Sequence, residues 1–103
     1  MHSSRHSYFL RAALFAALLG LVACQTAPVQ EMSDARQAIS VAREAGAAEH
    51  ASAEFKAAVD LLESAERHLN QREYQIARRD ALQAKLKALD ALQVSEVSKD
   101  PSQ

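Results

Sequence analysis

The sequence predicts an all-α protein: a helical hairpin with an additional N-terminal helix, packed as a small three-helix bundle that follows a cleaved signal peptide. Ala, Leu, Glu, Gln, Arg and Lys, which have the highest helix propensities, dominate the chain. Beyond residue 30 the only glycine is Gly46 and the only proline is Pro101. Alanines and leucines recur there at three- and four-residue spacing, the period of a helix face. Residues that favour strands are scattered.

The first 23 residues have the pattern of a secretory signal peptide. Residues 1–11 contain Arg5 and Arg11 and no acidic residue, and residues 12–23 are uncharged and largely apolar. A basic start, a short apolar stretch and a small residue before the cleavage site are typical of such leaders. The apolar stretch is shorter than the roughly 20 residues that a membrane-spanning helix needs. A cleaved leader is therefore favoured over a permanent span.

The leader ends in Leu21-Val22-Ala23-Cys24, and Cys24 is the only cysteine in the chain. This tetrapeptide resembles the lipobox of bacterial lipoproteins. The resemblance implies cleavage between Ala23 and Cys24 and attachment of two or three fatty-acyl chains, palmitate among them, to Cys24. In Gram-negative lipoproteins an Asp after the cysteine favours the inner membrane, so Gln25 implies the periplasmic face of the outer membrane. The alternative is an ordinary secreted protein with an incidental cysteine, which could form no internal disulfide.

The mature chain would carry 10 basic and 13 acidic residues, a net charge of −3. This balance disfavours nucleic acid, which requires a concentrated basic surface. The densest basic stretch contains Arg78, Arg79, Lys85 and Lys87 but is interrupted by acidic residues. We therefore interpret it as a solvated helix face.

Residues 24–31 are mostly polar and predict a lipidated tether ahead of a helical domain over residues 32–97. The first helix is expected from Met32 or Ser33 to Ala45, with Ser33 as N-cap and Gly46 at the C-terminal end. A second helix is expected from Ser52 to Asn70, with Ser52 as its N-cap.

Residues 70–72 predict a tight connection to a third helix, which we expect over 73–94 or 73–97, followed by a frayed tail over 98–103. On this helix, alanines alternate steps of four and three, beside a stripe of leucines. The alanines are Ala77, Ala81, Ala84, Ala88 and Ala91, and the leucines are Leu82, Leu86 and Leu89. The alanines allow a close approach between helices, so the second and third helices should form an antiparallel hairpin with the first packed on it.

Several short segments carry a family resemblance, and they are Ala35-Arg36-Gln37-Ala38-Ile39, Ala45-Gly46-Ala47-Ala48-Glu49-His50-Ala51, Leu61-Leu62-Glu63-Ser64-Ala65, Tyr74 and Ala77-Arg78-Arg79. Through them residues 35–92 resemble the DUF4398 family of small bacterial envelope proteins. That family often has Tyr where His50 stands here. The resemblance implies a helical fold and an envelope location, and it implies no reaction.

The sequence indicates no catalytic, cofactor-binding or metal-binding residues. Acylation of Cys24 would remove the thiolate that a nucleophile needs. His50 and Glu54 have helical spacing for two metal ligands, but a zinc site needs at least a third. His68 is expected on a solvated helix side, and Tyr74 is expected to pack at the start of the third helix.

We therefore expect a membrane-anchored, non-enzymatic envelope lipoprotein that acts as a structural or protein-interaction module. The alternative is an accessory or regulatory subunit of an envelope enzyme, transporter or peptidoglycan-associated complex. The expected partners are membrane lipid, through Cys24, and either another protein or a second copy, through the Ala/Leu faces of the third helix. No nucleic acid, small-molecule substrate or cofactor is expected.

Overall fold

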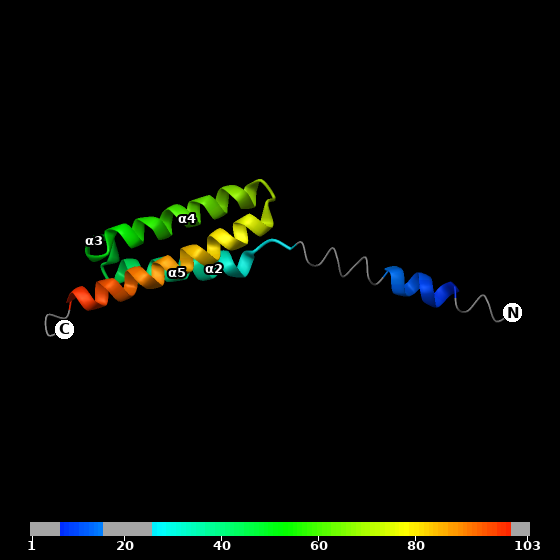
Figure 1. Cartoon of the computed structure of the whole chain (residues 1–103), viewed down its shortest axis with the longest axis horizontal. Coiled ribbons are helices and arrows are strands. Elements are labelled where there is room, and N and C mark those ends of the chain that lie inside the picture. The colour runs from blue at the N-terminus through cyan, green and yellow to red at the C-terminus, as the bar shows by residue number, and fades with distance from the viewer. Residues whose placement is uncertain (1–6, 16–25, 100–103) are drawn as a thin grey trace.

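The computed structural model describes residues 7–15 and 26–99, and both ranges are largely helical (Figure 1). Residues 7–15 form a short helix whose residues are all exposed. The second range contains the helices α2 (Val29–Glu44), α3 (Ala47–His50), α4 (Ser52–Asn70) and α5 (Tyr74–Lys99). Neither range contains a strand. The predicted all-α class is confirmed.

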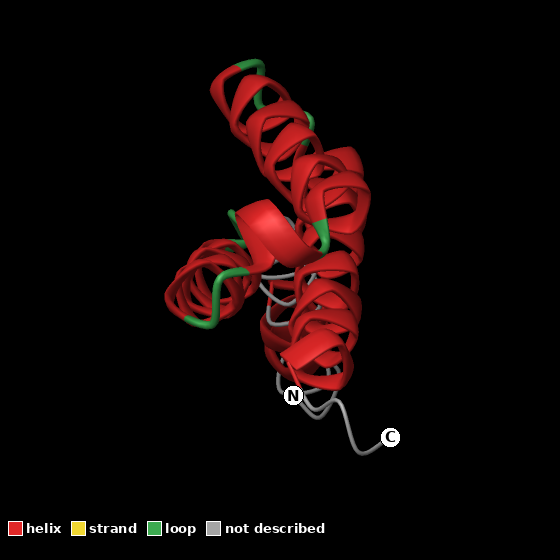
Figure 2. Ribbon diagram, turned by 90° about the vertical axis from the view of Figure 1, so that its left-hand side faces the viewer, coloured by secondary structure: helices red, strands yellow, loops and turns green. Residues whose placement is uncertain are grey.

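Three long helices, α2, α4 and α5, pack as a bundle. Helix α4 runs back along α2 and turns into α5, so α4 and α5 form the predicted antiparallel hairpin (Figure 1), and Figure 2 shows the bundle from one end, with helices and loops only among the described residues. Met32 near the start of α2 packs with Ala81, and Ala42 near its end packs with Ala91. Helices α2 and α5 therefore run in the same direction. The predicted three-helix bundle is confirmed.

The core of the bundle consists mainly of alanine. The alanine face of α5, defined as Ala77, Ala81, Ala84, Ala88 and Ala91, is 0 % exposed at every position. Alanines of α2 lie opposite it in three successive layers, joined in two layers by alanines of α4 and in the third by Ala47 and Ala51. Larger side chains of α4 are only partly buried at the edges of these layers, and they include Phe55, Leu61, Leu62 and Leu69. Small side chains bring the helix backbones close together, as the alanine spacing predicts.

Helix α2 begins earlier than expected, and its N-cap differs from the prediction. Pro28 occupies the N-cap position and is buried, and its carbonyl accepts the first helical hydrogen bond, from the Met32 amide at 3.0 Å. Ser33 lies inside the helix and is exposed, so the predicted Ser33 cap is wrong. Proline has the φ angle of a helix already fixed, which favours a helix start next to it. Only residues 26–28 of the expected tether precede the helix in the described range.

The connection between α2 and α4 contains α3, a single helical turn. The N-cap of α4 lies one residue earlier than predicted. The N-cap position belongs to Ala51, without a side-chain hydrogen bond, and Ser52 is the first helical residue. The Ala51 amide donates to the Ala47 carbonyl at 2.9 Å, and the Ala51 carbonyl accepts from the Phe55 amide at 2.9 Å. Ala51 thus joins α3 to α4 through its own backbone, and the Ser52 prediction is wrong.

Both helix-to-helix connections use a residue with positive φ. Gly46 has φ of 83°, which confirms its predicted place after α2. Arg72 has φ of 60°, and the amides of Arg72 and Glu73 donate to the carbonyls of Leu69 and His68. This is the Schellman pattern, in which glycine is usual. A side chain in this conformation costs roughly 1–2 kcal/mol.

Helix α5 continues to Lys99, two residues beyond the longer predicted end. The Ser95 hydroxyl donates to the Ala45 carbonyl at 3.0 Å, and the Lys99 ammonium donates to the same oxygen. Ala45 follows the last residue of α2, where carbonyls lack partners within the helix. These two side chains therefore complete the end of α2, and Ser98 and Lys99, expected in the frayed tail, are helical.

Candidate interaction surface

Large apolar side chains lie exposed along the outer side of α5. We define the leucine surface as Leu82, Leu86, Leu89 and Val97 of α5 with Val41 of α2, whose exposed fractions are 46, 61, 44, 54 and 43 %. Isolated exposed apolar residues are ordinary, but a contiguous group marks an interaction site. The steps from Leu82 to Leu86 and from Leu86 to Leu89 place three leucines on one side of the helix.

The leucine surface points away from the bundle because of helix geometry. Leu86 lies two residues from both Ala84 and Ala88, which are 0 % exposed. Two residues correspond to about 200° around a helix. The alanine face and the leucine surface are therefore opposite sides of α5. The predicted leucine stripe is present, but its members do not pack against α2 or α4 as core residues.

Val41 and Leu89 belong to one shallow hollow between α2 and α5. The hollow is lined by Asp34, Gln37, Ala38, Val41, Lys85 and Leu89. It thus connects an exposed apolar residue of α2 to the leucines of α5. The leucine surface consequently spans two helices and offers both a ridge of leucines and a depression beside it.

Charged side chains border the leucine surface unevenly. Arg79, Lys85 and Lys87 precede Leu89 on α5, and the acidic residues Asp90 and Glu96 follow it. The outer side of α4 differs, because its exposed residues include both acidic and basic side chains and no large apolar one. In one such pair, the Lys56 ammonium donates to the Asp60 carboxylate at 2.8 Å, which raises the pKa of Lys56. The apolar surface is thus particular to α5 and its border with α2.

A second cluster of polar side chains lies between α4 and α5 near their turn. The Ser64 hydroxyl donates to the Asp80 carboxylate at 2.7 Å, and His68 Nε2 lies 3.9 Å from the same oxygen. His68 Nδ1 is 3.2 Å from a Glu73 carboxylate oxygen. Asp80 is only 6 % exposed, so the Ser64 hydrogen bond satisfies a buried charge.

This cluster contains serine, histidine and aspartate but lacks the geometry of a nucleophilic triad. In such a triad the serine donates to the histidine, which acts as the base. Here the Ser64 hydroxyl donates directly to Asp80. We therefore interpret the cluster as a structural contact of the hairpin. The sequence interpretation missed it, although Ser64 and Asp80 are equally distant from residue 72 and so face each other in the hairpin.

The other residues considered from the sequence are dispersed. His50 is exposed and Glu54 is half-buried, and the described part of the chain holds no group of three or more His, Cys, Asp or Glu residues suited to a metal ion. Tyr74 is half-buried at the first position of α5. Ala23 and Cys24, the predicted cleavage and lipidation residues, lie outside the described residues.

Arg78 of α5 forms hydrogen bonds with the segment before α2 and with the first turn of α2. Its Nη2 donates to the Thr26 carbonyl at 3.0 Å, and its Nε donates to the Glu31 carboxylate at 3.3 Å. With the buried Pro28, these contacts hold residues 26–28 against the bundle. The sequence contains no local signal for this contact, because Arg78 and Thr26 are 52 residues apart.

The fold and the surface define the class of protein: a small three-helix bundle with an exposed apolar side on its longest helix. Within that class, the model of the family described as "Domain of unknown function (DUF4398)" matches residues 30–99, and the chain belongs to the DUF4398 family. The match covers nearly all of α2 and the whole of α3, α4 and α5. Comparisons with curated proteins and with solved structures found no match. No helix in the described ranges is long and apolar enough to cross a membrane.

Proposed function

We propose that this protein is a lipid-anchored, non-enzymatic interaction module on the periplasmic face of the outer membrane, and that its leucine surface binds another envelope protein. The observation that carries the docking role is the exposure of Leu82, Leu86 and Leu89 on the side of α5 that faces away from the bundle. The sequence Leu21-Val22-Ala23-Cys24 supports the anchor. Two or more acyl chains on Cys24 would give stable membrane attachment.

The partner that best fits the leucine surface is an amphipathic helix with acidic residues beside its apolar face. A helix of this kind can place apolar side chains between the leucines and into the hollow at Val41. Acidic residues would complement Arg79, Lys85 and Lys87, which precede Leu89 on α5.

A second copy of this chain fits less well. Copies that stand side by side on one membrane, anchored through the same residue, would pair their α5 helices in parallel. Parallel pairing would bring Arg79, Lys85 and Lys87 of one copy against the same residues of the other. Like charges in such proximity oppose association.

A non-enzymatic role is supported by the arrangement of the reactive side chains that the structure describes. The Ser64, His68 and Asp80 cluster is organised around a buried carboxylate rather than an activated hydroxyl. His50 lies exposed at the other end of the bundle, on α3. We therefore propose that binding, and not a reaction, is the function of the surface.

The anchor is tested by the mass of the mature protein. Expression of the full chain in a Gram-negative host should yield a protein that begins at Cys24 and carries diacylglycerol and an N-terminal acyl chain. Cys24→Ser should abolish both the acylation and the membrane attachment. An unmodified cysteine on the mature wild-type protein would contradict the proposal.

Docking is tested by photo-crosslinking in native membranes. A photoreactive amino acid at position 86 should give one dominant adduct. The mass of this adduct should differ from that of a dimer of this chain, which shows that the partner is a different protein. The same amino acid at exposed Glu63, on α4, is the matched control and should give no such adduct. An adduct with the mass of a dimer would show self-association and would replace the proposed partner.

A further inference from the structure

We infer that the end of the bundle formed by the α4–α5 turn faces the lipid headgroups and that Arg72, at the tip of that turn, binds lipid phosphate. The inference rests on the proposed acylation of Cys24. It adds an orientation on the membrane and a second binding surface, separate from the leucine surface.

The position of the anchor follows from the contacts of Arg78. The Thr26 carbonyl is held by the Arg78 guanidinium at 3.0 Å, and Pro28 is buried against the bundle. Cys24 lies two residues before Thr26, and two residues span at most about 7 Å. The acyl chains on Cys24 would therefore join the chain within about 7 Å of Thr26, which is held at the end of the bundle where α5 begins.

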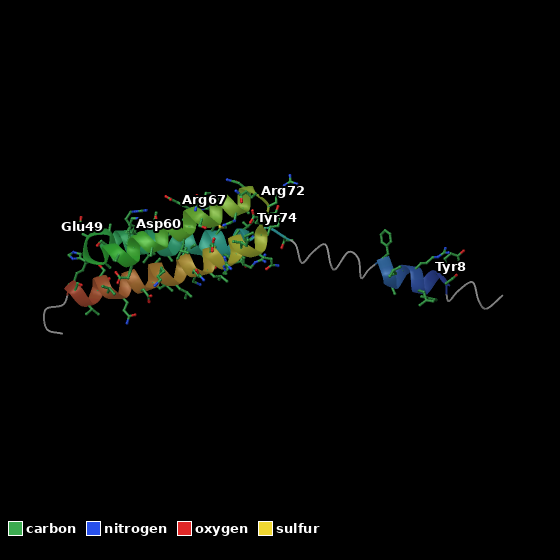
Figure 3. All side chains as sticks on the ribbon, turned by 45° about the horizontal axis from the view of Figure 1, so that its top comes forward. Tyr8, Glu49, Asp60, Arg67, Arg72 and Tyr74 are labelled. Carbon is green, nitrogen blue, oxygen red and sulfur yellow. The ribbon has the colours of Figure 1, made fainter. Side chains whose placement is uncertain are left out.

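The α4–α5 turn lies at the same end of the bundle as this attachment point (Figure 1). Leu69, in the last turn of α4, packs against the cluster that contains Met32, in the first turn of α2. Residues 71–73 follow Leu69 and therefore lie near the level of the start of α2. Figure 3 shows Arg72 and Tyr74 at the end where the chain enters the bundle and Glu49 at the opposite end. The turn and the attachment point thus share one end of the bundle, so a lipid surface at that end would lie near the turn.

Arg72 has two properties that its role in the fold does not explain. Its φ of 60° is a conformation in which glycine or asparagine is less strained. Its side chain is exposed and has no hydrogen-bond or ion-pair partner among the described residues. A strained residue without an internal partner suggests a contact outside the chain. A guanidinium group can bind a phosphate through two parallel hydrogen bonds.

The acidic residues near the turn are engaged in internal contacts. Glu73 contacts His68, Asp80 accepts the Ser64 hydrogen bond, and Glu31 accepts from Arg78. Arg67, in the last turn of α4, is exposed and also has no partner among the residues that the structure describes. The free charges at this end are therefore cationic, which suits the anionic phosphates of a lipid surface.

The distribution of charge on α5 opposes the other orientation, in which the bundle lies flat with its leucine surface in the membrane. A helix that lies in a membrane interface usually carries basic residues on its polar face. On α5 the acidic residues Asp90 and Glu96 lie on the half far from the anchor, and the one basic residue at that far end, Lys99, is engaged with the Ala45 carbonyl. An end-on orientation keeps those two acidic residues away from the phosphates and leaves the leucine surface accessible to a protein.

The inference is tested with the full, acylated chain in vesicles of phosphatidylethanolamine, phosphatidylglycerol and a spin-labelled phosphatidylcholine that quenches fluorescence on near contact. A fluorophore is attached to a single introduced cysteine, at Gln71→Cys on the turn or at Glu49→Cys at the opposite end. Acylated Cys24 has no free thiol to react. Quenching should be several-fold stronger at position 71 than at position 49.

Two substitutions separate the contributions of Arg72 and Arg78. Arg72→Glu should reduce quenching at position 71, and Arg72→Gly should reduce it while raising the unfolding temperature, a combination that misfolding cannot produce. Arg78→Ala should reduce the difference between positions 71 and 49, because residues 26–28 are released. Lys56→Ala, which removes an exposed cation near the start of α4 and far from the turn, is the control and should leave both values unchanged.

Two outcomes would overturn the inference, and they are distinguishable. Equal quenching at positions 71 and 49 in an acylated protein would show a flat or random orientation and would leave the proposed function intact. A protein that carries no acyl chain by mass and does not float with the vesicles would overturn the proposed function together with the inference.

Discussion

The two sides of α5 reverse the usual distribution of side-chain size. On the inner side, the five residues of the alanine face are completely buried. On the outer side, Leu82, Leu86 and Leu89 are 44–61 % exposed. Full burial of a leucine contributes about 1.5–3 kcal/mol, so a fold optimised for stability alone would bury these residues. The difference indicates that the inner side serves the close packing of helices and the outer side serves binding.

The same contrast bears on stability. Alanine contributes little apolar area per residue, and a domain of this length has a small core. Its stability therefore depends on the helix backbones remaining close together. Larger side chains on the inner side of α5 should therefore reduce the free energy of unfolding strongly. Substitutions on the outer side should change that free energy little and should weaken binding.

The largest expected effect comes from enlarging the inner side. Ala88 is 0 % exposed and packs with Ala38, Ile39 and Ala58. Ala88→Leu should separate α5 from its neighbours and reduce the free energy of unfolding by about 3 kcal/mol. Urea unfolding followed by circular dichroism measures this loss. A change below about 0.5 kcal/mol would show that the alanine face tolerates large side chains and would remove the basis of the comparison.

A smaller loss is expected from the buried polar contact beside the alanine face. Ser64→Ala removes the hydrogen bond to Asp80, which is 6 % exposed, and should cost about 2 kcal/mol. Ser98→Ala is the control, because the exposed Ser98 hydroxyl only donates to the Val94 carbonyl of its own helix. The double variant Ser64→Ala with Asp80→Ala should lose less free energy of unfolding than the sum of the losses in the two single variants. Strict additivity would contradict a direct contact.

Arg72 is an exposed residue, like the leucines of α5, and its presence lowers the stability of the fold, which substitution by glycine tests. Arg72→Gly should raise the free energy of unfolding by about 1 kcal/mol, because glycine adopts the positive φ of 60° without strain. Gly46→Ala, at φ of 83°, should have the opposite effect of similar size. Thermal unfolding of both variants measures the pair. A stability loss in Arg72→Gly would show that the arginine side chain supports the fold itself.

The smallest effect on stability is expected on the outer side of α5. Leu86→Ala should change the free energy of unfolding by less than about 0.5 kcal/mol, because the side chain is 61 % exposed. It is the matched control for Ala88→Leu, two residues away on the opposite side. When the photoreactive amino acid is placed at position 82 of the Leu86→Ala variant, the yield of the adduct with the partner protein should fall sharply. A stability loss comparable to that of Ala88→Leu would place Leu86 in the core.

Local sequence patterns predicted the elements that depend on local physics. The alternating alanine spacing predicted the buried side of α5, Gly46 was placed correctly at a positive φ, and residues 70–72 were identified as a tight connection. The serine caps failed because Pro28 and Ala51 provide the helix starts through backbone geometry. Local propensity does not distinguish a serine at a cap from one a few residues inside a helix.

The contacts that depend on distant parts of the chain could not be predicted from local patterns. Arg78 was interpreted as part of a solvated face, yet it holds Thr26 and Glu31. Asp80 was regarded as one of the acidic residues that interrupt a basic stretch, yet it is buried against Ser64. Both contacts require the packed arrangement of three helices. The leucine stripe was identified from its spacing, but its outward direction became evident only from the packing of the alanines.

The most direct test of this account measures folding and binding together in one variant. Leu82→Gln combined with Leu89→Gln removes apolar side chains of the leucine surface and leaves the alanine face intact. With a photoreactive amino acid at position 86 in native membranes, we expect the variant to remain folded with a loss of about 2 kcal/mol in the free energy of unfolding, while the adduct with the partner protein disappears. Undiminished adduct formation in a folded variant would contradict the claim that the leucine surface is the binding site.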